Sequence, residues 1–377
     1  MIYDLFNGDA DGICALHQLR LSQPLDTVLI TGLKRDINLL SKIDPQSGDQ
    51  LTVLDISLDR NRIELIDALN KGVRVDYFDH HHTGEIPQSE NLNVHIDTSS
   101  EICTSLIVNK YLQGIYSSWA IVGAYGDNLY RAAEREAKIH NFNNNELQQL
   151  KELGTALNYN GYGIELNDLH YHPKDLFLTV SKYNNPFEFI NEEEKYQNLF
   201  YGYKNDLELA SAIKPSLIKG CVIVHLPNTK WARRVSGVYG NQLARENPNR
   251  AHALFTETQG GYRVSVRAPL VFKQNADTLC LQFDSGGGRA GAAGINYLED
   301  QAIEIEGFHF FGSPITPSFG GWGFNVDRGD SIRKVWSKIP TNTDVLITHG
   351  PPFGYGDKLD IGDRVGCPDL LEEVITR

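Results

Sequence analysis

Carboxylates and histidines gather in four short stretches of the N-terminal part of the chain. The first stretch is NGDADG, in which Asp9 and Asp11 are separated by one residue and followed by Gly12. Asp55 stands in LDIS, three histidines follow an aspartate in FDHHH, and Asp127 stands in GAYGDN. Carboxylate oxygens and imidazole nitrogens, with no thiolate nearby, suit Mn²⁺, Mg²⁺ or iron better than structural zinc. Two such cations about 3.5–4 Å apart can activate a water for attack on phosphorus.

Each stretch also has a purely structural interpretation. Asp55 and Asp127 could be helix N-caps or turn residues, which are common roles of Asp. NGDADG matches the first half of a calcium-binding loop, but Gln18 stands where that loop needs a bidentate glutamate. Four such stretches together, each at the end of a predicted strand or helix, favour one shared metal centre.

Strand and helix patterns alternate around these stretches. Five runs rich in Val, Ile, Tyr and Phe are predicted strands, namely MIYDLF, DTVLITGL, DQLTVLDI, VRVDYFD and LNVHID. Between them, ICALHQLRLS, DRNRIELIDALNKG and CTSLIVNKYLQ space apolar residues three and four apart, as amphipathic helices do. The alternation predicts an α/β fold in which helices cover both faces of a parallel sheet. Its ligands would lie beyond the carboxyl ends of the strands, where the acidic stretches are.

Changes of composition divide the chain into four predicted segments. Residues 1–185 form the α/β catalytic domain, and residues 186–214 form a charged helical connector. Residues 215–296 form a smaller α+β domain, because GCVIVHLP, AHALFTET and YRVSVRAPL are predicted strands. Residues 297–377 are richer in Gly, Pro and Trp and form an incomplete α/β segment.

Composition narrows the classes of function. The 377 residues carry a formal net charge of −13. This charge argues against binding of long duplex DNA, because sequence-independent binding depends on Lys and Arg that neutralise phosphates. Five scattered cysteines without a CxxC pair are typical of a reduced, cytoplasmic protein. The chain has neither an apolar run long enough to span a membrane nor an N-terminal secretion signal, so no membrane partner is expected.

The stretches FNGDADG, LDIS, FDHHH and GAYGDN resemble the first four motifs of the DHH phosphoesterase superfamily, in the same order. That superfamily includes RecJ-type exonucleases, oligoribonucleases, cyclic-dinucleotide phosphodiesterases and family II pyrophosphatases. The run GGGR followed by AGAAG resembles the glycine signature of the DHH-associated C-terminal domain. The resemblance covers about residues 1–296. It implies a phosphoesterase with two Mn²⁺ ions, or Mg²⁺ in their place, that activate a hydroxide between them.

The resemblance also assigns the metal ligands. One ion would be held by Asp9 and Asp55. The other ion would be held by Asp11, Asp55, His80 and Asp127. Asp55 would therefore bridge the two ions.

The remaining residues of these stretches have other implied roles. Asp79 would orient an imidazole, and His81 would donate a hydrogen bond to the substrate phosphate. His82 has no assigned role and is expected in a solvated loop. Asn7 departs from the pattern, because pyrophosphatase-like relatives place a histidine ahead of the two aspartates. The first ion would therefore be held more weakly, and pyrophosphatase activity is disfavoured.

The second domain supplies the predicted substrate-binding residues. They are a glycine run, the arginine after it and an arginine in SVRAP, namely Gly286, Gly287, Gly288, Arg289 and Arg267. Successive glycines let backbone N–H groups approach an anion, and Arg289 can add a bidentate fork. Arg233 and Arg234 are weaker candidates, and a glycine-rich turn between a strand and a helix is the structural alternative. By resemblance, the glycine run binds the nucleotide end away from the scissile phosphate, so that a cleft between the domains would fix substrate length.

The last segment resembles a different family. NYLEDQAIEIEGFHFFGSP, DVLITHGPPFGYGD and DRVGCPDLL are similar to the middle of a calcineurin-like metallophosphoesterase. In that family the histidine of THGPP, here His349, is a metal ligand, but the other ligand motifs are absent from this chain. One histidine cannot hold a dinuclear site, so residues 297–377 are expected to be inactive. Half of a sandwich exposes strand edges, so a homo-oligomer is among the expected assemblies.

These inferences favour a metal-dependent phosphodiesterase. Its expected substrates and partners are short oligonucleotides or a cyclic dinucleotide, hydrolysed by the hydroxide that two ions activate. A RecJ-like 5′-exonuclease acting on single strands is an alternative that the acidic charge weakens. A metal-dependent nucleotide-binding or interaction protein without turnover is the non-enzymatic alternative.

Overall fold

The computed structural model describes residues 1–377 with the exception of 219, 259–260, 284, 299–300, 306–307, 319–324, 360–361 and 377. The chain divides into two compact units. Unit 1 comprises Met1–Ile213 and Thr229–Tyr239, and unit 2 comprises Lys214–Asn228 and Gly240–Arg377. The domain boundaries predicted from the sequence stay predictions.

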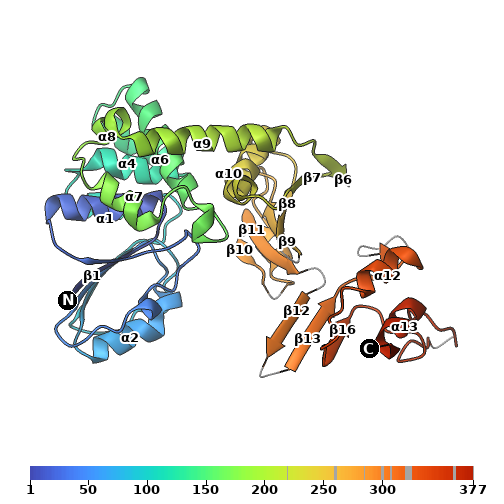
Figure 1. Cartoon of the computed structure of the whole chain (residues 1–377). Coiled ribbons are helices and arrows are strands. Elements are labelled where there is room, and N and C mark those ends of the chain that lie inside the picture. The colour runs from blue at the N-terminus through green and yellow to red at the C-terminus, as the bar shows by residue number, and fades with distance from the viewer. Residues whose placement is uncertain are drawn as a thin grey trace. The chain divides into compact units, whose positions relative to one another are not determined.

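Unit 1 is built on a parallel sheet of five strands in the order β2-β1-β3-β4-β5 (Figure 1). The strands are β1 (Ile2–Phe6), β2 (Val28–Ile30), β3 (Gln50–Leu54), β4 (Arg74–Asp79) and β5 (Leu92–Ile96). They coincide with the five strands expected from the sequence. The strand order reverses between β1 and β3, and the crevice at such a reversal is where open parallel sheets bind ligands.

Helices cover both faces of this sheet, which confirms the predicted α/β fold class (Figure 1). They are α1 (Ala10–Ser22), α2 (Arg62–Asn70), α3 (Thr104–Tyr111), α4 (Ser117–Gly126), α5 (Tyr130–Ile139), α6 (Asn144–Asn160), α7 (Pro173–Val180), α8 (Pro186–Glu192) and α9 (Glu194–Ser211). Helix α2 packs Leu65 and Leu69 on one face, against Leu51, Val53 and Val75 of the strands. The other face is covered by a larger helical layer.

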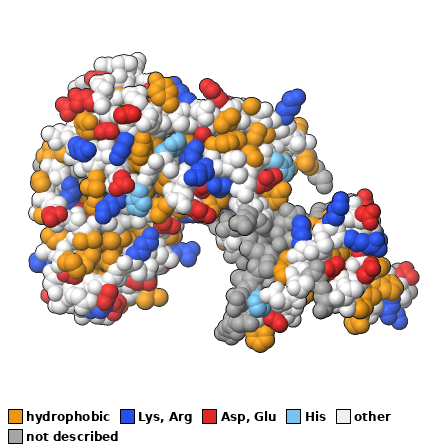
Figure 2. Space-filling view, in the orientation of Figure 1, with side chains coloured by type: hydrophobic (Ala, Val, Ile, Leu, Met, Phe, Trp, Pro, Cys, Tyr) orange, Lys and Arg blue, Asp and Glu red, His pale blue; other side chains and the backbone are white. Residues whose placement is uncertain are grey.

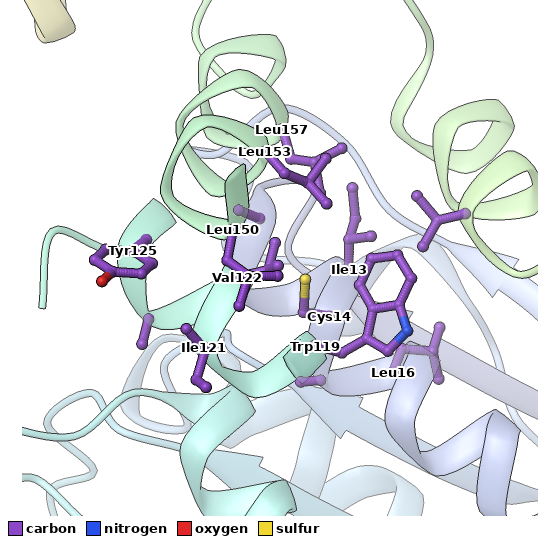
Figure 3. Packing of buried hydrophobic residues seen from close by; sticks show 14 of the residues in the cluster. Ile13, Cys14, Leu16, Trp119, Ile121, Val122, Tyr125, Leu150, Leu153 and Leu157 are labelled. Atoms are coloured by element: carbon purple, nitrogen blue, oxygen red, sulfur yellow. The ribbon is translucent and has the colours of Figure 1, made fainter. Parts of the chain in front are cut away.

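The larger layer has its core where α1, α4 and α6 meet (Figure 3). Its labelled side chains are Ile13, Cys14, Leu16, Trp119, Ile121, Val122, Tyr125, Leu150, Leu153 and Leu157. A Cβ on Gly154 would overlap the carbonyl oxygen of Val122, so this glycine lets α4 and α6 approach closely. Burial of each large apolar side chain stabilises the fold by about 1.5–3 kcal/mol. The core thereby fixes the N-terminus of α1, which carries Asp9 and Asp11, and the C-terminus of α4, which Asp127 follows.

Unit 2 contains a mixed sheet of six strands in the order β10-β11-β9-β8-β7-β6. These strands are β6 (Ser216–Ile218), β7 (Cys221–Leu226), β8 (His252–Thr258), β9 (Gly261–Arg267), β10 (Gly287–Arg289) and β11 (Ala292–Leu298). The helices next to these strands in sequence are α11 (Ala276–Cys280) and the C-terminal part of α10 (Lys230–Glu246), which begins in unit 1. This combination agrees with the α+β architecture expected from the sequence.

The end of the chain forms a small α/β arrangement with its own core. A sheet of three strands has the order β12-β13-β16, and a pair is formed by β14 and β15. The elements are β12 (Gln301–Ile305), β13 (Phe308–Ser313), β14 (Thr316–Pro317), β15 (Asn325–Val326), α12 (Asp330–Trp336), β16 (Val345–Thr348) and α13 (Pro368–Ile375). Phe311, Ile332, Trp336 and Leu370 are buried together there.

Surface properties agree with the composition. On the face that Figure 2 shows, the described Lys and Arg side chains lie among Asp and Glu side chains and form no continuous basic band. Among the described helices, none combines the length and the apolar character that crossing a bilayer requires.

Two arginines at the start of α10 are engaged in ion pairs within unit 1. Arg233 donates to both oxygens of Asp168 at 2.7–3.0 Å, and the backbone N–H groups of Ile164 and Glu165 donate to the same carboxylate. Arg234 donates to Asp206 at 3.0 Å and to the hydroxyl of Tyr159 at 2.9 Å. These two side chains therefore join α10 to the helical layer, which explains their charge without a substrate.

The Asp168 pair predicts a pH-dependent contribution to stability. Burial opposes ionisation of Asp168, but Arg233 and the two backbone donors lower its pKa below the usual 3.8. The unfolded chain then binds the proton more readily, so this contribution is complete above about pH 5 and is lost as the pH falls through the lowered pKa. We expect Asp168→Asn to reduce the free energy of unfolding by about 1–3 kcal/mol at pH 7 and by much less at pH 2.5, measured by urea denaturation.

The exposed Asp26 provides the control, because Asp26→Asn should leave the free energy of unfolding unchanged at both pH values. An equal loss of stability for Asp168→Asn at both pH values would contradict the role of the charged pair.

Candidate metal centre

The carboxyl ends of β1, β3 and β4 and the end of α4 bring the four acidic stretches together. Asp9 follows β1, Asp55 follows β3, His80 follows β4, and Asp127 follows α4. Ion-pair distances link them, because Nε2 of His80 lies 3.4 Å from Oδ1 of Asp55 and 3.8 Å from Oδ2 of Asp127. Residues separated by more than a hundred positions thus share one site at the edge of the sheet.

Asp55 leaves its strand with an unusual backbone conformation. Its φ is +59°, in the left-handed region that costs an ordinary residue about 1 kcal/mol or more but that Asp and Asn tolerate. Its backbone N–H donates to the carbonyl of Phe78 at 3.0 Å, which keeps the residue tied to β4. The hydroxyl of Thr104 donates to its carboxylate at 3.1 Å. The turn directs the carboxylate into the centre, where it is 2% exposed.

Asp55, His80 and His81 form the group best suited to hold a cation. One ligand atom from each of these residues lies within 4.8 Å of the others. It is the one group of three or more acidic, histidine or cysteine ligands found in the part of the chain that the structure describes. The His80 side chain is 7% exposed and that of His81 is 28% exposed, so His81 is the more accessible of the two imidazoles.

Asp79 holds the imidazole of His81. Oδ1 of Asp79 lies 2.7 Å from Nδ1 of His81. Burial opposes protonation of His81, but the hydrogen bond to Asp79 and the carboxylate of Asp55 raise the pKa of the imidazole above 6.5. At neutral pH a larger fraction of the ring is therefore protonated, and able to donate a hydrogen bond, than in an ordinary histidine. His82, by contrast, is exposed.

Asp11 anchors the N-terminus of α3. Its two carboxylate oxygens accept from the backbone N–H groups of Thr104 at 2.7 Å and Ser105 at 2.8 Å. The positive end of the helix dipole favours a carboxylate at this position. Each oxygen retains a second lone pair, so these bonds are compatible with a role as a metal ligand.

Asp9 faces a lysine that the sequence analysis did not single out. Its Oδ1 accepts from the backbone N–H groups of Asp11 and Gly12, which caps α1, and its Oδ2 accepts from the ammonium of Lys34. The same ammonium donates to Oδ1 of Asn158 at 3.1 Å and lies 3.7 Å from Oδ1 of Asp127. Lys34 stands in TGLKRD, in the loop that follows β2, and no motif of the sequence marks it.

Asp127 connects the lysine to the histidines. Its Oδ1 faces Lys34, whereas its Oδ2 faces His80. The centre therefore has two halves that share this carboxylate: an imidazole half at Asp55 and His80, and an ammonium half at Asp9 and Lys34.

The neighbouring charges shift the pKa values of Asp55, Asp127 and Asp9 in different directions. Burial, together with the nearby carboxylates of Asp11 and Asp9, raises the pKa of Asp55 well above 3.8. Burial also raises the pKa of Asp127, although Lys34 opposes that shift. For Asp9 the effect of burial is overcome by the ammonium of Lys34, which lowers the pKa of this carboxyl. In the imidazole half a bound cation would therefore offset the negative charge of Asp55. In the ammonium half the positive charge of Lys34 already offsets that of Asp9.

The imidazole half fits a divalent cation on three observations. Its donors are carboxylate oxygens and imidazole nitrogens, the set that Mn²⁺ and Mg²⁺ accept. One ligand atom each of Asp55, His80 and His81 lies within 4.8 Å of the others, so that Asp55 and His80 are close enough to share a cation. Oδ2 of Asp79, which faces away from its bond to His81, is buried without a hydrogen-bond partner among the described residues, as expected of a polar atom beside a site for a ligand or water.

The predicted substrate-binding residues belong to unit 2. Gly287, Gly288 and Arg289 form the exposed edge strand β10, rather than a turn between a strand and a helix. A Cβ on Gly286 would overlap the carbonyl oxygen of Cys280, and one on Gly288, whose φ is +143°, would overlap Ala293, so packing requires both glycines.

Arg267 is held between its own strand, β9, and helix α10. Its guanidinium donates to Oδ1 of Asn241 at 2.7 Å and to the hydroxyl of Ser265 at 2.8 Å. His349 is exposed and belongs to no group of potential metal ligands among the described residues.

Comparisons with known proteins define the fold. No known family profile matches the chain. The structure is similar to that of the exonuclease RecJ bound to manganese, with a TM-score of 0.51 and 16% identity, over 78% of this chain and 85% of that chain. The parallel sheet and its helices therefore form a RecJ-like fold.

Sequence relatives match a shorter stretch. UPF0046 protein T07D4.2 of Caenorhabditis elegans is 44% identical over 81 residues, which is 22% of this chain and 20% of that protein. Metallophosphoesterase domain-containing protein 1 of Homo sapiens is 46% identical over 82 residues, which is 22% of this chain and 25% of that protein. The chain thus spans about a fifth to a quarter of the curated relatives that it matches.

The geometry predicts that Mn²⁺ stabilises unit 1 through His80. Saturating Mn²⁺ should raise the melting temperature of the wild type by several degrees, because a ligand of the folded state at about 100 times its Kd adds about 2.7 kcal/mol. His80→Ala should abolish the shift, whereas His82→Ala should retain it, as measured by differential scanning fluorimetry. The shift should shrink as the pH falls, since burial raises the pKa of Asp55 and protons then compete with the cation. A full shift in His80→Ala would contradict the assignment of this ligand.

Proposed function

We propose that the chain is a metal-dependent phosphodiesterase that hydrolyses short nucleotidic substrates, either di- to oligonucleotides or cyclic dinucleotides. The observation that carries the proposal is the Asp55, His80 and His81 group beside the buried Asp79. A RecJ-like fold supports the placement of such a group at the strand ends. Two Mn²⁺ ions were expected from the sequence, and the centre has at least one half that suits such an ion.

The residues of the centre have separable roles in this proposal. A divalent cation held by Asp55 and His80 would offset charge on the phosphate oxygens and lower the pKa of a bound water. His81, held by Asp79 at 2.7 Å and readily protonated, donates a hydrogen bond to a phosphate oxygen as negative charge develops on it. Asp11 keeps α3 in place, so that the Thr104 hydroxyl orients Asp55.

Substrate length is the second part of the proposal. The formal charge of −13 and the mixed surface charges in Figure 2 favour a short substrate over a long strand that needs an extended basic groove. Arg289, exposed on the edge strand β10, would bind the nucleotide end away from the scissile phosphate. Arg267 is the less accessible candidate, because its guanidinium already has two side-chain partners.

The RecJ-like fold favours one alternative, a 5′-exonuclease acting on single strands. The C-terminal segment adds no second activity in our proposal. The aligned stretches of 81 and 82 residues are as long as residues 297–377, which suggests that the metallophosphoesterase match falls there. Its single THGPP histidine, His349, is exposed and lacks ligand partners among the described residues.

One panel of substrates tests the activity. Linear dinucleotides, cyclic dinucleotides, 5′-phosphorylated single-stranded DNA and pyrophosphate are each incubated with Mn²⁺ or Mg²⁺. We expect turnover of a dinucleotide, and we expect His81→Ala to reduce kcat about 10²–10⁴-fold with little change in KM. The neighbouring His82→Ala is the matched control and should keep wild-type kinetics. Mononucleotides released from long DNA would favour the exonuclease, and binding without turnover of any substrate would favour a binding protein.

The role of Arg289 has its own test. Arg289→Ala should raise KM for a linear dinucleotide about tenfold or more, which corresponds to loss of one charge-assisted hydrogen bond of about 1.5–3 kcal/mol. Arg245→Ala, an exposed arginine near the end of α10, is the control. An unchanged KM in Arg289→Ala would remove this arginine from the substrate site.

A further inference from the structure

Lys34 lies beside Asp9, where the family resemblance of the sequence implies the first metal ion, the one assigned to Asp9 and Asp55. The ammonium group contacts Oδ2 of Asp9, Oδ1 of Asn158 at 3.1 Å and Oδ1 of Asp127 at 3.7 Å. Two hydrogen-bond acceptors and one ion-pair partner therefore surround the ammonium. Asp9 is more fully engaged than Asp11. Its Oδ1 already accepts from the backbone N–H groups of Asp11 and Gly12 and its Oδ2 accepts from Lys34, whereas each oxygen of Asp11 accepts one hydrogen bond.

The lysine is fixed by its backbone independently of these acids. The backbone N–H of Lys34 donates to the carbonyl of Gly161 at 3.1 Å, and the carbonyl of Lys34 accepts from Nδ2 of Asn7 at 3.1 Å. A Cβ on Gly8 would overlap the carbonyl oxygen of Gly32, so the loops after β1 and β2 are in direct contact. These contacts hold the start of the side chain beside Asp9 whether or not a cation is nearby.

Asn7 connects this arrangement to the sequence. It stands directly ahead of the two aspartates, where a metal-ligating side chain would strengthen the first site. Instead, its amide nitrogen binds the backbone of Lys34. Asn7 therefore helps to position Lys34 through the backbone of that residue.

We infer that the centre takes a single divalent cation, in its imidazole half, and that the ammonium of Lys34 supplies the second positive charge at Asp9. The inference rests on the proposed metal-dependent function and differs from the two ions expected from the sequence. Lys34 is then a fixed positive charge for a phosphate oxygen, placed by the fold rather than bound from solution. Asp127 couples the two halves, because one of its oxygens faces Lys34 and the other faces His80.

The number of bound Mn²⁺ ions tests this directly. Isothermal titration calorimetry and native mass spectrometry of the full chain should give one Mn²⁺ ion for the wild type, with the six-line electron paramagnetic resonance spectrum of an isolated ion. Lys34→Gln should bind Mn²⁺ about tenfold more tightly or accept a second ion, because a positive charge has left the centre. Lys34→Arg keeps the charge and should bind one ion with nearly wild-type affinity.

A second variant keeps the test independent of folding defects at Lys34. Asp9→Asn should still bind one Mn²⁺ ion, since Asp9 is not its ligand. Two ions per wild-type chain with an exchange-coupled spectrum would overturn the inference and leave the proposed function intact. A wild-type chain that binds no Mn²⁺ would overturn both.

Discussion

Burial of several carboxylates at one edge of a parallel sheet is the constraint on which the rest of the structure depends. Asp9, Asp11, Asp55 and Asp79 are each no more than 2% exposed, and the free energy cost of burying an unpaired charge is high. Each carboxylate is given a different partner: an ammonium for Asp9, helix N–H groups for Asp11, and an imidazole for Asp79. Asp55 is the least compensated, which is why its pKa rises most plainly and why a cation is expected beside it.

The surrounding fold serves this constraint. The N-termini of α1 and α3 point their backbone N–H groups at Asp9 and Asp11, and the core between α1, α4 and α6 keeps these helix ends in register. The left-handed backbone conformation of Asp55 costs free energy. Its position directly after β3 and the hydrogen bond from its backbone N–H to Phe78 of β4 offset that cost. Rigid elements thus carry the charged groups, as an electrostatically preorganised site requires.

Much of the fold was predictable from the sequence, because each strand of unit 1 is a short run rich in apolar, β-branched or aromatic residues and is followed by a polar residue. The acidic stretches were recognisable for the same reason: they follow strands, and the ends of parallel strands meet at one edge. Lys34 was not predictable in this way, since its contact with Asp9 depends on β2 lying beside β1 in the sheet. The ion pairs of Arg233 and Arg234 could not be predicted from the sequence either, because their partners, Asp168 and Asp206, are distant in sequence and belong to no motif. Their positive charges, which suggested substrate contacts, instead join α10 to unit 1.

The central claim is that Asp55 and His80 hold a catalytic cation, and anomalous diffraction at the manganese edge tests it most directly. A crystal of the full chain grown with Mn²⁺ should show an anomalous peak about 2.0–2.4 Å from a carboxylate oxygen of Asp55 and from Nε2 of His80. No peak at these two residues, or manganese bound only elsewhere on the chain, would contradict the account.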